Sequence, residues 1–240
     1  MNNAPNPLEA SSQIPLKPVT LGLEGATVRY GDHTVLDNVS VMFDKPEIAV
    51  ILGSNGAGKS TFLSACAGLL PLSSGRAFRQ EADGTPVPIT RLGYVLQKPV
   101  MFRRSVMDNI MMATRALPLH DAGLARRRDA LLSLLGLQHL IHKPVHHLSI
   151  GERQRLVVAR VLITQPGILM CDEATNSLDT ASVDIMEAQI RDCADQGLPV
   201  LWVTHSMDQA RRLADRVIRI EDGRITYDGP AAAFFAKTRP

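Results

Sequence analysis

Apolar and polar residues alternate along two stretches near the beginning of the chain, Thr20–Tyr30 and Val35–Phe43. An alternation of period two is typical of strands with one buried face, and Gly31-Asp32 between the two stretches is typical of a turn. These stretches are therefore predicted to form antiparallel strands. The following run, Ile48–Leu52, is apolar throughout, which indicates a buried strand.

Three later apolar runs also predict buried strands, and each is followed by polar or titratable residues. Leu92–Leu96 precedes Gln97, Ile168–Cys171 precedes Asp172 and Glu173, and Val200–Thr204 precedes His205. Helical spacing and capping signals predict helices at Ser105–Ala116, Ala122–Leu135 (capped by Asp121), Arg153–Leu162, Ala181–Asp195, Met207–Ala214 and the C-terminus. This interleaving indicates an α/β fold.

The remaining stretches are predicted to be turns, loops and short strands. Residues 1–18 are rich in Asn, Pro and Ser and are predicted to form a mobile tail. Ser73–Gly75 is predicted to be a turn, and Arg79–Pro88 the tip of a hairpin. Val217–Ile220 and Arg224–Tyr227 are predicted to be two short strands around a turn.

A glycine-rich sequence separates the Ile48–Leu52 run from a helical segment and has the pattern G-x-x-x-x-G-K-[S/T] of a phosphate-binding loop. It comprises Gly53, Ser54, Asn55, Gly56, Ala57, Gly58, Lys59, Ser60 and Thr61. Glycines let successive N–H groups point at one anion, and a helix that begins near Lys59 adds its dipole. Lys59 is predicted to reach the β- and γ-phosphates, and Ser60 to bind Mg²⁺. The chain is therefore predicted to bind a nucleoside triphosphate.

Two carboxylates, Asp172 and Glu173, end an apolar strand in the same chain. Together with a phosphate-binding loop, this pattern predicts that Asp172 holds Mg²⁺ and that Glu173 polarises an attacking water. Two other residues are ambiguous by themselves. Gln97 either binds Mg²⁺, orients a water or is only a polar strand terminus. Tyr30 is either a ring stacked on a nucleobase or an ordinary strand aromatic.

The composition narrows the class of partner. Lys+Arg 26 against Asp+Glu 24 gives a formal net charge of +2, which argues against a nucleic-acid partner.

No apolar run approaches the 18 or so residues of a membrane span, and the N-terminus has no signal-peptide pattern, so the site is expected in the cytoplasm. Cys66, Cys171 and Cys193 are predicted to be buried core residues. The histidines between His139 and His147 lack nearby carboxylate or cysteine partners, which argues against a metal site.

In their order along the chain, these motifs resemble those of the nucleotide-binding subunit of an ATP-binding cassette (ABC) transporter. The landmarks are Tyr30, the Walker A loop Gly53–Thr61, the Q-loop Gln97, the signature Leu148–Glu152, the Walker B run Ile168–Glu173, the D-loop Ser177–Asp179 and the switch histidine His205. The resemblance implies an α/β P-loop NTPase core with a mixed sheet, an antiparallel β subdomain and an inserted α-helical subdomain at about 98–160. Residues 19–240 are then one ABC ATPase domain. Ile150 and Glu152 depart from the usual signature L-S-G-G-Q, which leaves the rate of the reaction open.

The resemblance also implies the chemistry, because members of this family hydrolyse ATP with Mg²⁺ as head-to-tail dimers. The catalytic roles fall on Glu173, His205 and Gln97, and metal ligation falls on Ser60, Gln97 and Asp172. Tyr30 and Gly53–Thr61 of one copy are implied to bind the nucleotide, and Ser149 and Gly151 of the second copy are implied to close over it.

The resemblance finally implies membrane partners. The helical subdomain is expected to dock on transmembrane permease subunits at the cytoplasmic face of the membrane, with Met101, Phe102 and Val106 facing the docking groove. The tract Leu96–Ile110 is similar to that of oxyanion importer ATPases, so import of an oxyanion such as tungstate, with a substrate-binding protein, is predicted. The alternatives are a soluble ABC ATPase of DNA repair or translation, and an exporter. The chain has neither sustained heptads nor a second cassette, which argues against the soluble class.

Overall fold

The computed structural model describes residues 19–97, 100–116, 123–176 and 178–237. The predicted tail (residues 1–18), the predicted cap Asp121 and the D-loop residue Ser177 lie outside this part of the chain. Within the described residues, no helix has both the length and the apolar character needed to cross a membrane.

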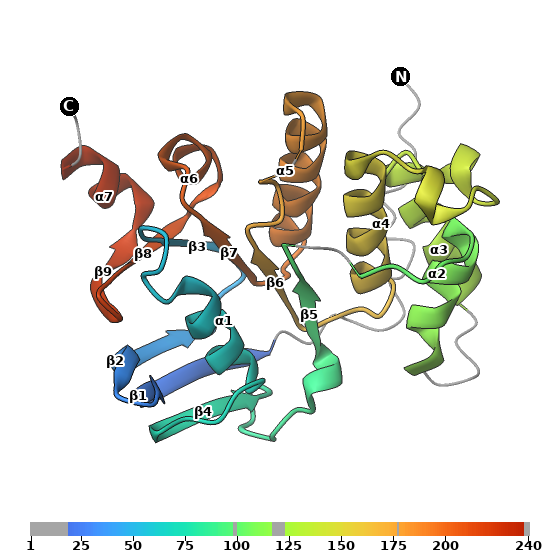
Figure 1. Ribbon diagram of the computed structural model, residues 1–240. Helices are drawn as coiled ribbons and strands as arrows, with labels where there is room; N and C mark the ends of the chain where they lie inside the picture. Colours follow the sequence, from blue (N-terminus) through green and yellow to red (C-terminus); the bar gives the residue numbers. More distant parts are fainter. Residues whose placement is uncertain (1–18, 98–99, 117–122, 177, 238–240) are drawn as a thin grey trace.

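The strands form two sheets (Figure 1). The larger has the order β5 (Leu92–Val95), β6 (Ile168–Asp172), β7 (Val200–Thr204), β3 (Ile48–Leu52), β8 (Arg216–Glu221) and β9 (Arg224–Pro230). Its pairs are parallel except β8 with β9, so the sheet is mixed. The smaller sheet is antiparallel, in the order β2 (His33–Phe43), β1 (Thr20–Tyr30) and β4 (Ser74–Gln80).

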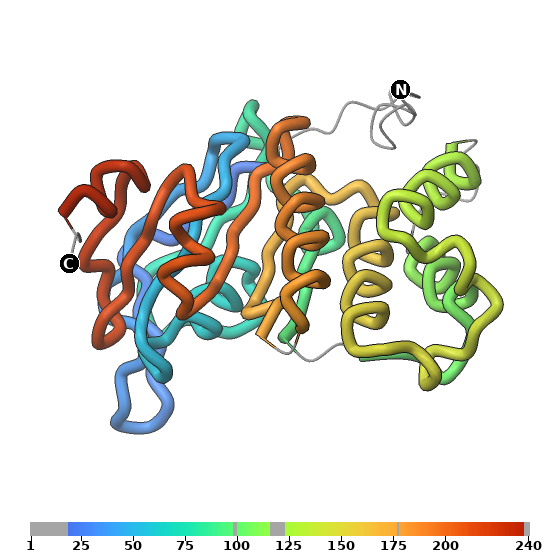
Figure 2. Tube along the Cα trace, turned by 90° about the horizontal axis from the view of Figure 1, so that it is seen from above, coloured from blue at the N-terminus to red at the C-terminus, as the bar shows by residue number. Residues whose placement is uncertain are grey.

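The helices occupy both faces of the larger sheet and one end of it. They are α1 (Lys59–Ala67), α2 (Val106–Ala113), α3 (Leu124–Leu134), α4 (Ile150–Leu162), α5 (Thr180–Asp195), α6 (Met207–Leu213) and α7 (Ala231–Lys237). Helix α1 lies between the two sheets, and α4, α5 and α6 cover the opposite face of the larger one (Figure 1). Both views place α2 and α3 beyond α4, away from the sheets (Figures 1 and 2).

The central strands explain why their sequences are apolar without alternation. Along β3, Ile48, Val50 and Leu52 belong to the core under α4–α6, whereas Ala49 and Ile51 belong to the core between the sheets. Successive side chains of a strand point to opposite faces, and here both faces are covered. The continuous apolar runs therefore report burial on two sides.

One local prediction is wrong. Ser73–Gly75 is not simply a turn, because β4 begins at Ser74 and pairs antiparallel with β1. The strand runs along the edge of the small sheet, and its residues are exposed or half-buried, so its sequence carries no apolar signal. Gly75 has φ of 80°, and a Cβ there would lie 2.3 Å from the carbonyl oxygen of Gly25.

Candidate active site

The polar residues that follow the strands meet at one edge of the larger sheet. Strands β5, β6, β7 and β3 are adjacent and parallel, so their carboxyl ends face the same way. Gly53 follows β3, Glu173 follows β6, His205 follows β7, and Gln97 comes two residues after β5. The topology therefore gathers residues from four separate parts of the sequence.

The phosphate-binding loop forms an anion-binding turn at this edge. Gly58 has φ of 96° and precedes α1 without capping it by a side chain, so the first N–H groups of the helix point out of its N-terminus. A Cβ at position 58 would lie 2.8 Å from the carbonyl oxygen of Val35, which excludes larger residues. Lys59 is buried, and its ammonium donates to the carbonyl oxygens of Gly53 and Ser54, each at 2.9 Å. The lysine charge is thus held inside the curl of the loop.

Asp172 contacts the start of α1. The Ser60 hydroxyl donates to Asp172 Oδ1 at 3.1 Å. Burial raises the pKa of Asp172 above its ordinary value, the hydrogen bond from Ser60 opposes the shift, and the charge of Glu173 adds to it. The carboxylate is therefore in a place where a nearby cation stabilises its charged form.

Glu173 is the residue on which the site converges. Its Oε1 lies 3.8 Å from Lys59 Nζ and 3.6 Å from His205 Nδ1. Its Oε2 accepts a hydrogen bond of 3.3 Å from the side-chain amide of Gln97 and another from the side-chain amide of Asn176. Glu173 also has φ of 47°, a left-handed conformation that is uncommon for this residue type and concentrates at functional sites.

No role in the site was predicted for Asn176 from the sequence. It lies three residues after Glu173, in the turn that its own N–H makes with the Glu173 carbonyl oxygen at 3.2 Å. An amide at that offset from a strand-end carboxylate is the signal that a sequence reading could have used.

The oxygen donors at this edge suit Mg²⁺. Ser60 offers a hydroxyl, Asp172 a carboxylate and Gln97 an amide oxygen, and Mg²⁺ prefers such ligands, usually with one or two carboxylates, water and phosphate oxygens. No group of three His, Cys, Asp or Glu side chains that could hold a metal occurs in the described ranges. This donor set fits a Mg²⁺ ion that takes additional ligands from the phosphates of a nucleotide.

The remaining candidate residues do not reach this cluster within one chain. Tyr30 ends β1 in the small sheet and is 60% exposed. Ser149 caps α4 and Gly151 lies in its first turn, and this helix packs on the face of the large sheet opposite α1. None of the hydrogen bonds and ion pairs found among the described residues joins Ser149 or Gly151 to the Gly53–Thr61 loop.

The signature segment has its own local order. The Ser149 hydroxyl accepts from the Glu152 N–H at 3.1 Å, and Glu152 Oε2 accepts from the Ser149 N–H at 2.6 Å, so the two residues form a capping box. The hydrogen bond from Ser149 holds the pKa of Glu152 below its ordinary value. A Cβ at Gly151 would lie 2.3 Å from Ser182 Oγ, so a larger residue there would displace the Ser182 hydroxyl at the start of α5. Ile150 is 52% exposed.

Comparison with known proteins decides the family. The sequence profile of the family described as ABC transporter matches residues 36–176. The chain is 38% identical over 234 residues to an Fe(3+) ions import ATP-binding protein of Streptomyces coelicolor, covering 92% of this chain and 67% of that protein. It is 36% identical to a tungstate uptake system ATP-binding protein of Peptoclostridium acidaminophilum, covering 86% of this chain and 95% of the relative. The chain belongs to the ABC transporter family.

Solved structures agree with this assignment. The structure of cbiO1 from Clostridium perfringens, part of the ABC transporter complex cbiONQ, superposes with a TM-score of 0.80 at 29% identity, over 90% of each chain. The predicted α/β ABC ATPase fold, with its mixed sheet and antiparallel sheet, is thus confirmed. As a member of the ABC transporter family, the chain is a transport ATPase with ATP and Mg²⁺ as its nucleotide and metal.

Proposed function

We propose that this ABC ATPase hydrolyses ATP at the Glu173 cluster and thereby drives import of a solute through membrane-embedded permease subunits. The convergence of Lys59, His205, Gln97 and Asn176 on one carboxylate is the observation that carries the proposal. Phosphoryl transfer needs mainly positioning and charge stabilisation, and these groups supply both.

Each residue has a distinct role in the proposed reaction. The N–H groups of Gly53–Thr61 and the Lys59 ammonium hold the phosphates, and His205 contacts the γ-phosphate. Glu173 takes a proton from the attacking water, with its carboxylate oriented by the amides on Oε2. Ser60, Asp172 and Gln97 hold Mg²⁺, which neutralises charge on the phosphates when it is bound. Tyr30 stacks on the adenine, a role that its exposed ring supports.

A second copy of the chain completes the proposed site. Ser149 and Gly151 belong to a helix on the other face of the sheet from α1, which favours a composite site between two chains over one within a chain. In a head-to-tail homodimer, Ser149 and Gly151 of each copy close over the nucleotide of the other. The exposed Ile150 supports this, because it is an apolar side chain on the surface that closes.

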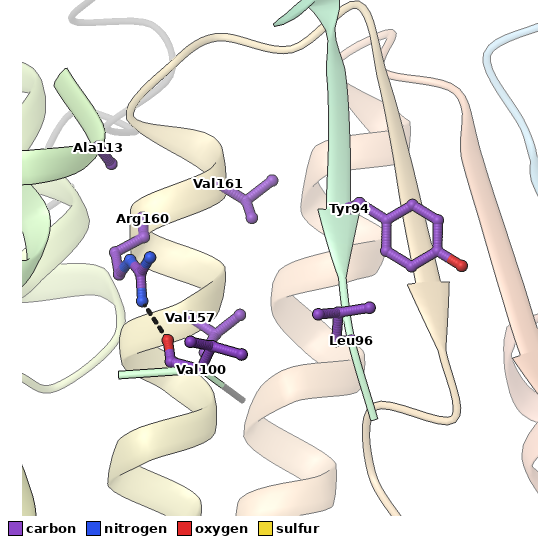
Figure 3. Close-up of a pocket in the computed structure, with 7 residues that line it drawn as sticks. All are labelled: Tyr94, Leu96, Val100, Ala113, Val157, Arg160 and Val161. Atoms are coloured by element: carbon purple, nitrogen blue, oxygen red, sulfur yellow. Dashed lines mark hydrogen bonds between the residues drawn. The ribbon is translucent and has the colours of Figure 1, made fainter. Parts of the chain in front are cut away.

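The helical part of the chain, about 98–160, is the proposed docking subdomain for the permease. A groove between β5, α2 and α4 is lined by Tyr94, Leu96, Val100, Ala113, Val157, Arg160 and Val161 (Figure 3). Val100 is 67% exposed, and Phe102 beside it is 40% exposed. Such an apolar groove suits a helix of a partner. The expectation that Val106 faces the groove is wrong, because Val106 is fully buried at the start of α2.

The proposed cargo is an oxyanion such as tungstate, delivered by a substrate-binding protein, and the ATPase works at the cytoplasmic face of the membrane. The relatives support import but name different cargoes, among them Fe(3+) ions, phosphonates, sulfate, tungstate and molybdenum. The choice of tungstate rests on the tract Leu96–Ile110 and on the relative of nearly equal length.

The test combines chemistry with partners. Purified protein should release phosphate from ATP in the presence of Mg²⁺, and Glu173→Gln should bind ATP normally while turnover falls by about 100-fold or more. Near wild-type turnover in Glu173→Gln would remove the general base from its proposed place. Affinity purification from membranes should then recover a permease, whose transport of labelled tungstate tests the cargo. Export activity, or no membrane partner at all, would overturn the proposal of import.

A further inference from the structure

Four buried polar side chains form a hydrogen-bonded network on the sheet face covered by α5 and α6. One of them, Thr175, is two residues after Glu173. The centre of the network is Gln209, whose Oε1 accepts a hydrogen bond of 3.1 Å from the indole N–H of Trp202. Gln209 Nε2 donates to Thr175 Oγ1 at 3.0 Å and to Glu187 Oε1 at 2.9 Å. These four residues are 7% exposed or less.

The hydrogen bonds leave one orientation for the Gln209 amide. An indole N–H can only donate, so the amide oxygen must face Trp202 and the NH₂ group must face Thr175 and Glu187. Both hydrogens of the NH₂ group are used. Glu187 is in turn held by Arg212, whose Nε and Nη2 donate to its two carboxylate oxygens at 2.9 and 2.8 Å. The network is therefore satisfied at its centre and closed by an ion pair.

The network connects the two segments that carry Glu173 and His205. Thr175 is two residues after Glu173, in the turn that follows β6. Gln209 is on α6, which begins two residues after His205, and its backbone N–H donates to the capping hydroxyl of Ser206 at 3.2 Å. A single amide thus links the turn that follows the general base to the helix that follows the switch histidine.

We propose that Gln209 and Thr175 are positioning residues that keep the side chains of Glu173 and His205 in a fixed relative position during ATP hydrolysis. The inference rests on the proposed roles of Glu173 and His205. Stability alone does not explain the network, because well-packed apolar side chains at buried positions are commonly at least as stable as buried polar ones. What hydrogen bonds add is direction. Helix α6 has only seven residues and buries two apolar side chains, Ala210 and Leu213, so it gains most from such a fixed link.

The first experiment removes one bond from the network. Thr175→Val keeps the shape of the side chain but loses the oxygen that accepts from Gln209, whereas Thr175→Ser keeps that oxygen. Thr114→Val is the matched control, since Thr114 is about equally buried and its hydroxyl donates to Met111 O at 2.8 Å, in the helical subdomain. We expect Thr175→Val to lower kcat about tenfold and to leave KM for ATP within about twofold, and Thr175→Ser and Thr114→Val to keep wild-type kcat.

The second experiment uses the only tryptophan of the chain, Trp202, as a spectroscopic reporter. Gln209→Met removes the acceptor of the indole N–H, so the Trp202 emission should shift to the blue, and kcat should fall at least as much as in Thr175→Val. Thr175→Val leaves the indole bond intact and should keep wild-type emission. A lower kcat with unchanged Trp202 emission in Thr175→Val indicates that Glu173 and His205 have lost their relative position in a protein that is still folded around Trp202.

The outcomes are distinguishable. If Thr175→Val has the kcat of Thr114→Val while Glu173→Gln is inactive, the positioning role is overturned and the proposed function stands. If Glu173→Gln hydrolyses ATP at the wild-type rate, the proposed function fails instead. Should Thr175→Val not fold, Thr175→Ala, which also lacks the hydroxyl but leaves space beside the amide, is judged by the same kcat criterion. Loss of kcat in Thr175→Ser equal to that in Thr175→Val would also contradict the inference.

Discussion

Ser60 and Asp172 are 112 residues apart in the sequence, and the Ser60 hydroxyl donates a hydrogen bond of 3.1 Å to Asp172 Oδ1. One residue is in the first turn of α1 and the other ends β6. The two oxygens are therefore adjacent at the place where the phosphate-binding loop ends, where both are available to the Mg²⁺ ion proposed above.

The first prediction concerns this pair. Asp172→Asn preserves the shape of the side chain but removes the charge that a divalent ion requires, so the Mg²⁺ concentration for half-maximal ATPase activity should rise by about tenfold or more. The measurement is a Mg²⁺ titration of activity at fixed ATP. Asp184→Asn, an exposed substitution on α5, is the control and should follow the wild-type curve. An unchanged Mg²⁺ requirement in Asp172→Asn would exclude Asp172 as a ligand.

The second prediction concerns Lys59. Lys59→Ala removes a buried cation and should weaken ATP binding by about 10- to 100-fold, the range of one or two charge-assisted hydrogen bonds. Equilibrium titration with ATP tests this, and Lys45→Ala at an exposed position is the control. Because Lys59 also bonds to two loop carbonyls, the unfolding temperature must be measured on the same sample. Tight ATP binding by a folded Lys59→Ala protein would contradict the assignment of the loop.

The third prediction is a pH dependence. Burial acts to raise the pKa of Glu187, but hydrogen bonds from Arg212 and Gln209 outweigh it and hold the pKa below its ordinary value of 4.5. A depressed pKa contributes stability that is complete above the pKa of the unfolded chain and is lost as pH falls through that of the folded chain. Glu187→Gln should therefore be about 1 kcal/mol less stable than wild type at pH 7, an estimate at the low end for charged hydrogen bonds because Arg212 is half exposed.

Urea unfolding from pH 7 down to about pH 3 tests this prediction, with the stability difference between wild type and Glu187→Gln shrinking below about pH 4.5. Asp32→Asn, an exposed substitution in the turn between β1 and β2, provides a comparison. A difference that stays constant or grows toward low pH would show that the charge of Glu187 does not contribute to stability in this way.

Much of the site follows from the sequence because of one topological rule. Gln97, Asp172, Glu173 and His205 each come at or just after the end of an apolar run, and parallel pairing brings such ends to one edge. The order of these residues along the chain then indicates the family. What the apolar pattern cannot give is the contact partner of each polar group, since that depends on loop conformation.

The features that could not be predicted share a physical cause. Strand β4 is an edge strand with exposed residues, so no apolar period marks it. Gln209 and Asn176 appear as ordinary polar residues, and only the packing of separate segments shows that one is buried and the other touches Glu173. Val106 looks like a surface apolar residue of a short helix, but α4 and its neighbours cover it. Tertiary contacts decide these positions.

The fourth prediction concerns the unusual signature. The Glu152 carboxylate is ionised and lies at the N-terminus of α4, where the proposed γ-phosphate of the other copy must approach. Glu152→Gln keeps an acceptor for the Ser149 N–H but removes the charge. In the Glu173→Gln background, which holds ATP, the dimer should therefore form about two- to fivefold more tightly, measured by analytical ultracentrifugation. The same comparison with ADP is the control, and a weaker ATP-dependent dimer would contradict the idea.

The last prediction tests the proposed docking groove through Phe102. The backbone at this position is held independently of the ring, because the side chain of the buried Asn109 accepts from the Phe102 N–H at 3.0 Å and donates to its carbonyl oxygen at 3.1 Å. Phe102 as a whole is 40% exposed, and the Arg160 guanidinium carbon lies 5.3 Å from the centre of its ring. Removal of the ring should therefore leave the local fold intact and reduce the apolar surface at the edge of the groove.

Phe102→Ala should keep the ATPase activity of the isolated subunit within about twofold of wild type and weaken its association with permease subunits by about tenfold, as truncation of an interface aromatic commonly does. Both quantities must be measured on the same preparation, the second by reconstitution with the permease in vesicles. Ile89→Ala, which removes an equally exposed apolar side chain outside the groove, should change neither. If the ATPase activity of the isolated subunit collapses while its association with the permease is normal, Phe102 supports the fold. The permease must then dock elsewhere, because loss of this ring does not weaken the interface.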